Sequence, residues 1–129
     1  MPGQLGTNII TEILPGAVGL TGGSQAITLQ STADGLTAHA TGGQGSATPI
    51  TTKLARFSTV ATLHDSSILP AAIAGSSLTV RNDGVAGMDV YPQNNGDIIN
   101  ALAVNTPLTC GAASTTTFRC YTTGKWVSN

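Results

Sequence analysis

Polar and apolar residues alternate over short stretches in the second half of the chain, which is the pattern of half-buried β-strands. In residues 55–63, for example, Ala55, Phe57 and Leu63 would share one face of a strand. Similar stretches predict further strands at residues 78–81, 88–91, 98–102, 108–110, 116–121 and 126–127. Turn-forming Asn, Asp and Gly separate them at 82–84 and 94–97, and no stretch has a sustained helical period. The pattern predicts an all-β sandwich or barrel.

The first third of the chain has a weaker pattern. Alternation is faint at residues 25–31 and 36–41, and Asp34-Gly35 between them is a candidate hairpin turn. Residues 41–46 (TGGQGS) have the composition of a linker or long loop. We therefore expect residues 1–46 to form an extended, Gly/Thr-rich N-terminal arm or hairpin, and residues 47–129 to form the β-sandwich, within one compact domain overall.

Composition adds an expectation of assembly. The chain has 129 residues, of which only 9% are charged and 4% are aromatic, whereas about 25% are charged in a typical soluble protein. Because surface charge normally keeps proteins apart in solution, so low a content indicates a part of a larger assembly.

Charge and hydropathy exclude several partners. The net charge is −1, and the five basic residues are scattered along the sequence: Lys53, Arg56, Arg81, Arg119 and Lys125. We expect neither a phosphate-binding stripe for nucleic acid nor a basic cluster for a membrane surface. The longest uncharged run, residues 13–33, is interrupted by Pro and Gly and is too polar to span a bilayer. No signal peptide is recognisable in residues 1–7, so synthesis in the cytoplasm is expected.

The residues available for catalysis do not form a recognisable set, and we predict that the chain is not an enzyme. His64-Asp65-Ser66-Ser67 contains the residue types of a catalytic triad, but neighbours in a strand point to opposite faces. We interpret this stretch as a solvent-exposed turn. No phosphate-binding loop is present. We expect no cofactor and no metal, with a calcium site shared by turn aspartates as the weaker alternative.

The two cysteines leave three interpretations open. Cys110 and Cys120 have no partners at metal-ligand spacing. Small buried apolar residues are the first interpretation, and a cross-strand disulfide across a turn near Thr115 is the second. A reactive thiol is the third.

The order of several short motifs resembles small capsid decoration (cement) proteins of tailed bacteriophages, over residues 47–127. The motifs are Ala47-Thr48-Pro49-Ile50, Leu69-Pro70-Ala71-Ala72, Gly75 to Asn82, Val90-Tyr91-Pro92, Gly96 to Ala101, Thr117-Phe118 and Gly124-Lys125-Trp126. The resemblance implies a jelly-roll-like β-sandwich on the outside of an icosahedral head. Residues 1–46 have no counterpart in it.

The matched positions are expected to specify the fold rather than to contact a partner. They are Leu69, Pro70, Asn82, Val90, Tyr91, Pro92, Ile99, Asn100, Phe118 and Trp126. Tyr91 and Trp126 would anchor the core or an interface. Pro92 would end its strand, and Asn82 and Asn100 would cap turns through their side chains.

The resemblance implies a structural virion protein that binds the outer surface of a phage capsid and stabilises contacts between major-capsid subunits. The expected partners are the major capsid protein and further copies of the chain, in a dimer or trimer. The alternative is a receptor- or carbohydrate-binding β-sandwich of a phage fibre or tail, using Tyr91, Tyr121 and Trp126. A small hydrolase is the third and weakest hypothesis.

Overall fold

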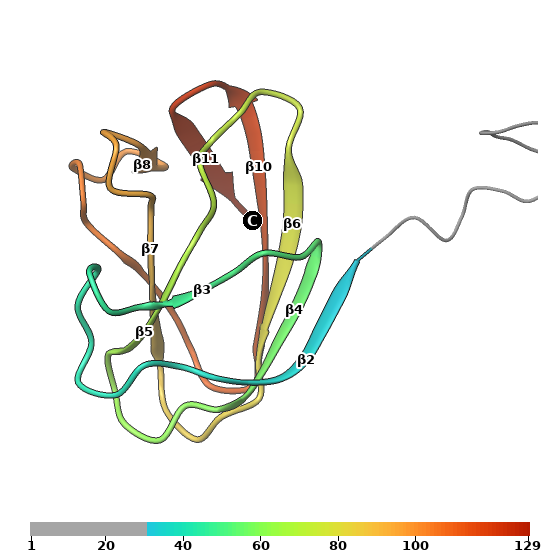
Figure 1. Ribbon diagram of the computed structural model, residues 1–129, viewed down its shortest axis with the longest axis vertical. Coiled ribbons are helices and arrows are strands. Elements are labelled where there is room, and N and C mark those ends of the chain that lie inside the picture. The colour runs from blue at the N-terminus through green and yellow to red at the C-terminus, as the bar shows by residue number, and fades with distance from the viewer. Residues whose placement is uncertain (1–30) are drawn as a thin grey trace, which may run out of the picture. The chain divides into compact units, whose positions relative to one another are not determined.

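The computed structural model describes residues 31–129, and within them every regular element is a β-strand (Figure 1). The strands are β2 (Thr32–Thr37), β3 (Thr48–Pro49), β4 (Leu54–Thr59), β5 (Asp65–Ile68), β6 (Ser77–Asn82), β7 (Met88–Tyr91), β8 (Ile98–Ile99), β9 (Leu108–Cys110), β10 (Ser114–Thr122) and β11 (Lys125–Ser128). They form a six-stranded sheet, in the order β2-β4-β6-β10-β11-β8, and a four-stranded sheet, in the order β3-β5-β7-β9. The prediction of an all-β protein is confirmed for this part of the chain.

Successive strands from β2 to β7 alternate between the two sheets, and each of the strands β2 to β5 pairs in parallel with the strand two places further along. β2 pairs with β4 and β4 with β6 in one sheet, while β3 pairs with β5 and β5 with β7 in the other. The chain therefore winds through one sheet and then the other and stacks each coil on the last, which is a short β-solenoid (Figure 1).

The predicted jelly-roll-like sandwich is therefore wrong. A jelly roll is built from antiparallel strands joined in Greek keys, whereas the ladders from β2 to β7 are parallel. The turn signal at 82–84 was correctly placed, but the chain there passes from β6 in one sheet to β7 in the other instead of reversing into a hairpin. Local alternation is the same in both architectures, because strand direction depends on pairing between distant segments.

The last strands close the solenoid with antiparallel pairs. β9 runs antiparallel to β7, and β10 runs antiparallel to both β6 and β11. β8 then pairs in parallel with β11 at the far edge of the six-stranded sheet.

The core consists of the inward-facing residues of the two sheets. Phe57, Phe118 and Trp126 are fully buried from the six-stranded sheet, and Met88 and Val90 are fully buried from the four-stranded sheet. Outward positions in between are exposed or half-buried in β4, β6 and β10. This period of two is the signal from which the sequence predicted these strands.

Two consecutive coils touch at the corner after β6. The amides of Val85 and Ala86 both donate to the carbonyl oxygen of Val60, at 3.1 and 3.2 Å. A Cβ atom on Gly84 would lie 2.4 Å from the backbone nitrogen of Val60. Glycine at this position therefore permits the close stacking of one corner on the next.

The start of the described chain differs from the sequence expectation in detail. Asp34-Gly35, predicted as a hairpin turn, lies inside β2, where the register with β4 shifts. β2 was included in the predicted arm, yet it is hydrogen-bonded to β4, and residues 31–129 form one compact unit. His39, also in the predicted arm, exchanges backbone hydrogen bonds with Ser66 of β5. The prediction for residues 1–30 lies outside the described residues.

Candidate functional site: the outer face of the six-stranded sheet

Four of the five basic side chains of the protein occupy outward positions of the six-stranded sheet. They are Arg56 on β4, Arg81 on β6, Arg119 on β10 and Lys125 on β11. Each adjoins residues that face the core, as Arg119 does between the buried Phe118 and Cys120.

The basic residues are scattered along the sequence, but strand order brings four of them onto one sheet. Sheet pairing places Arg56 beside Arg81, and Arg119 beside Val127 on β11. Lys53 immediately precedes β4. The alternation of residues within each strand was enough to predict that these cations face outward. Only the order of the strands in the sheet shows which cations lie side by side.

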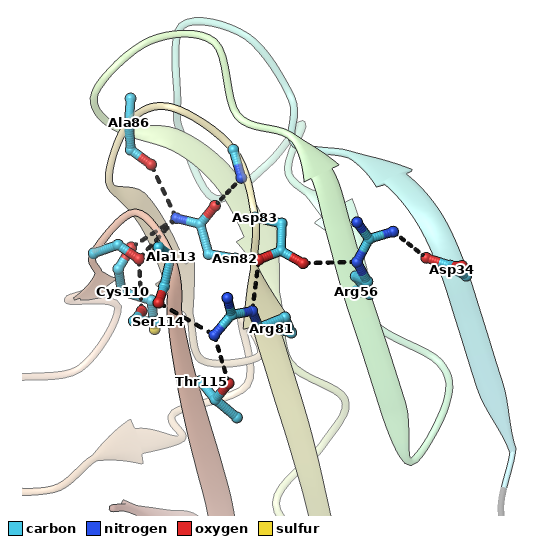
Figure 2. A network of polar contacts seen from close by, with 12 residues as sticks. Asp34, Arg56, Arg81, Asn82, Asp83, Ala86, Cys110, Ala113, Ser114 and Thr115 are labelled. Atoms are coloured by element: carbon cyan, nitrogen blue, oxygen red, sulfur yellow. Dashed lines mark hydrogen bonds and ion pairs between the residues drawn. The ribbon is translucent and has the colours of Figure 1, made fainter.

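An ionic network neutralises one end of this face (Figure 2). Arg56 donates from Nη1 to Asp34 Oδ1 and from Nε to Asp83 Oδ2, at 2.7 Å in both cases. Arg81 donates from Nε to the other oxygen of Asp83, at 2.6 Å. Asp83 therefore lies between two guanidinium groups, and β2, β4 and the end of β6 are linked through side chains.

The network favours the charged forms of its members. The hydrogen bond from Arg56, followed by that from the Gly35 amide, holds the pKa of Asp34 below its ordinary value. Hydrogen bonds from Arg56 and then Arg81 lower the pKa of Asp83. Bonds to the same two carboxylates raise the pKa of Arg56.

The network continues onto β10. Arg81 Nη1 donates to the Ala113 carbonyl at 3.2 Å and to Thr115 Oγ1 at 3.1 Å (Figure 2). An open depression of about 330 Å³ adjoins it, lined by residues of β2, β4 and β6 that include Leu54. Because both arginines here already have carboxylate partners, this end of the face has little unbalanced positive charge to offer a ligand.

The other end of the face has cations without acidic partners. Within residues 31–129, Arg119 and Lys125 make no ion pair, and both are exposed. Tyr121 and Val127 occupy outward positions on the same two strands and are 71% and 37% exposed. We call these four residues the hairpin patch.

The ten positions of the sequence resemblance lie mostly in the interior. Those that are fully buried are Leu69, Asn82, Val90, Pro92, Ile99, Phe118 and Trp126. Pro70, Tyr91 and Asn100 are half-buried. The structure therefore places these positions in and around the core, and the outer face of the six-stranded sheet is built from other residues.

Four of these positions have specific polar or backbone roles. Trp126 donates from Nε1 to the Pro70 carbonyl at 3.2 Å. Asn82 accepts a hydrogen bond from the Gly84 amide in the turn after β6. Asn100 ends β8 with a φ of 56° and exchanges two side-chain hydrogen bonds with Ser128. A left-handed backbone of this kind is tolerated by asparagine better than by most residues.

The stretch from His64 to Ser67 is not the exposed turn that was predicted, because Asp65–Ile68 is the buried strand β5. The Asp65 carboxylate accepts hydrogen bonds from the amides of Ala61 and Thr62 and thereby fixes the preceding turn. His64 instead lies 3.0 Å from a carboxylate that sequence reasoning did not connect with it, Asp89 on β7. No hydroxyl group within the described chain hydrogen-bonds to the His64 ring, so a nucleophile–base pair is not formed there.

The cysteines are unpaired. Cys110 on β9 and Cys120 on β10 are both buried and free, in agreement with the interpretation as small buried apolar residues. Burial raises the pKa of the Cys110 thiol, which lowers the thiolate population that a reactive cysteine needs.

Within residues 31–129, no group of three or more His, Cys, Asp or Glu side chains is placed to hold a metal ion. The same part of the chain contains no helix long and apolar enough to cross a membrane. Comparisons with protein-family models, with curated proteins and with solved structures find no match.

Proposed function

We propose that the chain is a structural virion protein that binds the outer surface of a phage capsid and stabilises contacts between major-capsid subunits, as a homo-oligomer of two or three copies. The observation that carries the proposal is the outer face of the six-stranded sheet. This face presents hydroxyl and basic side chains from adjacent paired strands. A regular sheet face changes little in shape on binding, which keeps the entropic cost of docking low.

The proposal does not depend on a jelly roll. It rests on the resemblance in sequence, on the low content of charged residues and on this face. The matched positions lie largely in the core. The resemblance therefore concerns residues that hold the scaffold, while the proposed contact is made by the outward residues of the same strands.

Two of the three aromatic side chains expected to form a carbohydrate-binding site are not freely exposed on the surface. Trp126 is fully buried and Tyr91 is half-buried, and only Tyr121 among the three is largely exposed. Sugar sites typically use exposed aromatic faces together with amide and carboxylate groups. A single exposed tyrosine beside two cations fits a protein interface better, because Tyr and Arg are enriched there.

The proposal is tested with phage heads that lack this protein. Purified chain should bind such heads to a saturating stoichiometry, and the decorated heads should retain DNA at higher temperature and after osmotic shock than the bare heads do. Binding to the assembled shell only would stabilise that state by mass action. Absence of head binding, with adsorption of the chain to host cells or their polysaccharides, would overturn the proposal in favour of the receptor-binding alternative.

A further inference from the structure

The hairpin patch differs from the rest of the basic face in that its cations have no acidic partner within the described chain. We infer that the hairpin patch is the docking surface of this protein, and that it binds an acidic, partly apolar surface on the capsid shell protein. This inference rests on the proposed function and specifies which part of the face makes the contact and what chemistry it recognises.

Sheet geometry brings the four residues together. Arg119 on β10 is paired with Val127 on β11. The register shifts between Arg119 and Thr122, and Thr122 is the residue paired with Lys125. Tyr121 lies next to Thr122, Lys125 lies two residues before Val127, and all four side chains of the patch are exposed. Residues two apart on a strand are separated by roughly 6–7 Å. Two cations and two exposed apolar groups therefore form one compact cluster.

The contrast with the other end of the face shows which cations are available. Arg56 and Arg81 share Asp83, and Arg56 also binds Asp34, at 2.6–2.7 Å, so a partner would have to break those bonds to use the two arginines. Within residues 31–129, Arg119 and Lys125 have no ion pair that a partner would have to break. Three further acids of the described chain, Asp65, Asp89 and Asp97, are buried and do not neutralise this surface.

A second copy of the chain is a poor occupant of the hairpin patch. In a two-fold contact the same surface meets itself, which would bring Arg119 and Lys125 of both copies together. Like charges at an interface cost several kcal/mol. An acidic surface with apolar groups for Tyr121 and Val127 is the complementary partner, and desolvation around the tyrosine ring would supply much of the affinity.

The test compares two double variants of equal net charge. In R119Q/K125Q the hairpin patch loses both cations. In the control, A103E/N105D, two negative charges are added in the exposed loop between β8 and β9. The aspartate at position 105 keeps the side-chain oxygen that accepts a hydrogen bond from Gln44 Nε2. Equal thermal stability of the two variants shows that both fold. Binding to protein-free heads is measured at low and physiological salt.

We expect R119Q/K125Q to bind heads about tenfold more weakly than A103E/N105D, with a shallower dependence on salt. Tyr121→Ser should weaken binding at all salt concentrations. On a sulfonate cation-exchange resin, R119Q/K125Q should elute before the control although their net charges are equal.

Each other outcome overturns a stated claim. If both double variants bind heads equally, the hairpin patch is not the docking surface, while the proposed function stands. If the two variants elute together from the resin, Arg119 and Lys125 are not available to an acidic surface, and the inference fails for that reason. If the wild-type chain does not bind heads, the proposed function fails, and the assignment of the capsid partner fails with it. Binding to double-stranded DNA or to anionic vesicles in place of heads would overturn the acidic protein partner.

Discussion

At the scale of single residues, Asn82 shows how one polar side chain holds three segments together. It is fully buried at the end of β6, and its Nδ2 group faces the carbonyls of Ala86, Cys110 and Gly111 at 2.9–3.1 Å (Figure 2). Its Oδ1 accepts from the Gly84 amide at 2.9 Å. The side chain therefore binds backbone groups in the corner after β6 and in the turn before β10, and the Gly111 carbonyl there also accepts from Ser114 Oγ.

Replacing Asn82 with aspartate tests this role, because the shape and the acceptor are kept while both donor hydrogens are lost. We expect Asn82→Asp to lower the free energy of unfolding by about 2–4 kcal/mol, since the carbonyls of Ala86 and Cys110 lose this donor and a carboxylate is buried beside them. Asn94→Asp makes the same chemical change at an exposed position and should alter stability by less than about 0.5 kcal/mol. Denaturant unfolding measures both. Equal stability of the two variants would contradict the role of the Asn82 bonds.

At the scale of elements, the sequence predicted individual strands better than their assembly. β7 and β9 were predicted at their observed residues, and β6, β10 and β11 were placed within a few residues, because Leu78, Val80 and similar residues alternate with polar ones. β5 was missed, because Asp65, Ser66 and Ser67 are polar and yet buried, so that its burial has no hydrophobic signature. The basic face was missed for a related reason, since it depends on which strands are neighbours.

The ionic network between β2, β4 and β6 makes a prediction about pH. The pKa values of Asp34 and Asp83 are depressed in the folded chain, so their contribution to stability is present above the ordinary value of 3.8 and is lost as pH falls through the lower folded values. Arg56→Met should therefore lower the melting temperature slightly at neutral pH, and the difference from wild type should vanish near pH 2, where both carboxylates are protonated.

Arg119→Met is the matched control, because Arg119 is an exposed arginine of the same sheet without an acidic partner in residues 31–129. Its difference from wild type should not change with pH across the same range. Scanning calorimetry of the three proteins from pH 7 to pH 2 supplies the comparison. A constant Arg56→Met difference at all pH values would show that the network contributes nothing through charge.

At the scale of the whole described chain, stability should be graded along the stack of coils. In a solenoid each coil contacts only its neighbours, so an inner strand is held from both sides and a terminal strand from one. β6 lies between β4 and β10, and β7 lies between β5 and β9, whereas β2 and β3 each have one paired neighbour in the described chain.

Native-state hydrogen exchange resolves this gradient. We expect the amides of β6 and β7 to exchange at least about tenfold more slowly than those of β2 and β3, because opening the first coil breaks one interface while opening an inner coil breaks two. The measurement is made at two protein concentrations in dilute solution, with exchange followed by mass spectrometry of peptides from each strand. Protection of β2 equal to that of β6 would contradict an open first coil and would mean that another strand pairs with its free edge. If that protection rose with concentration, the additional strand would come from a second copy, since only an intermolecular pair responds to dilution.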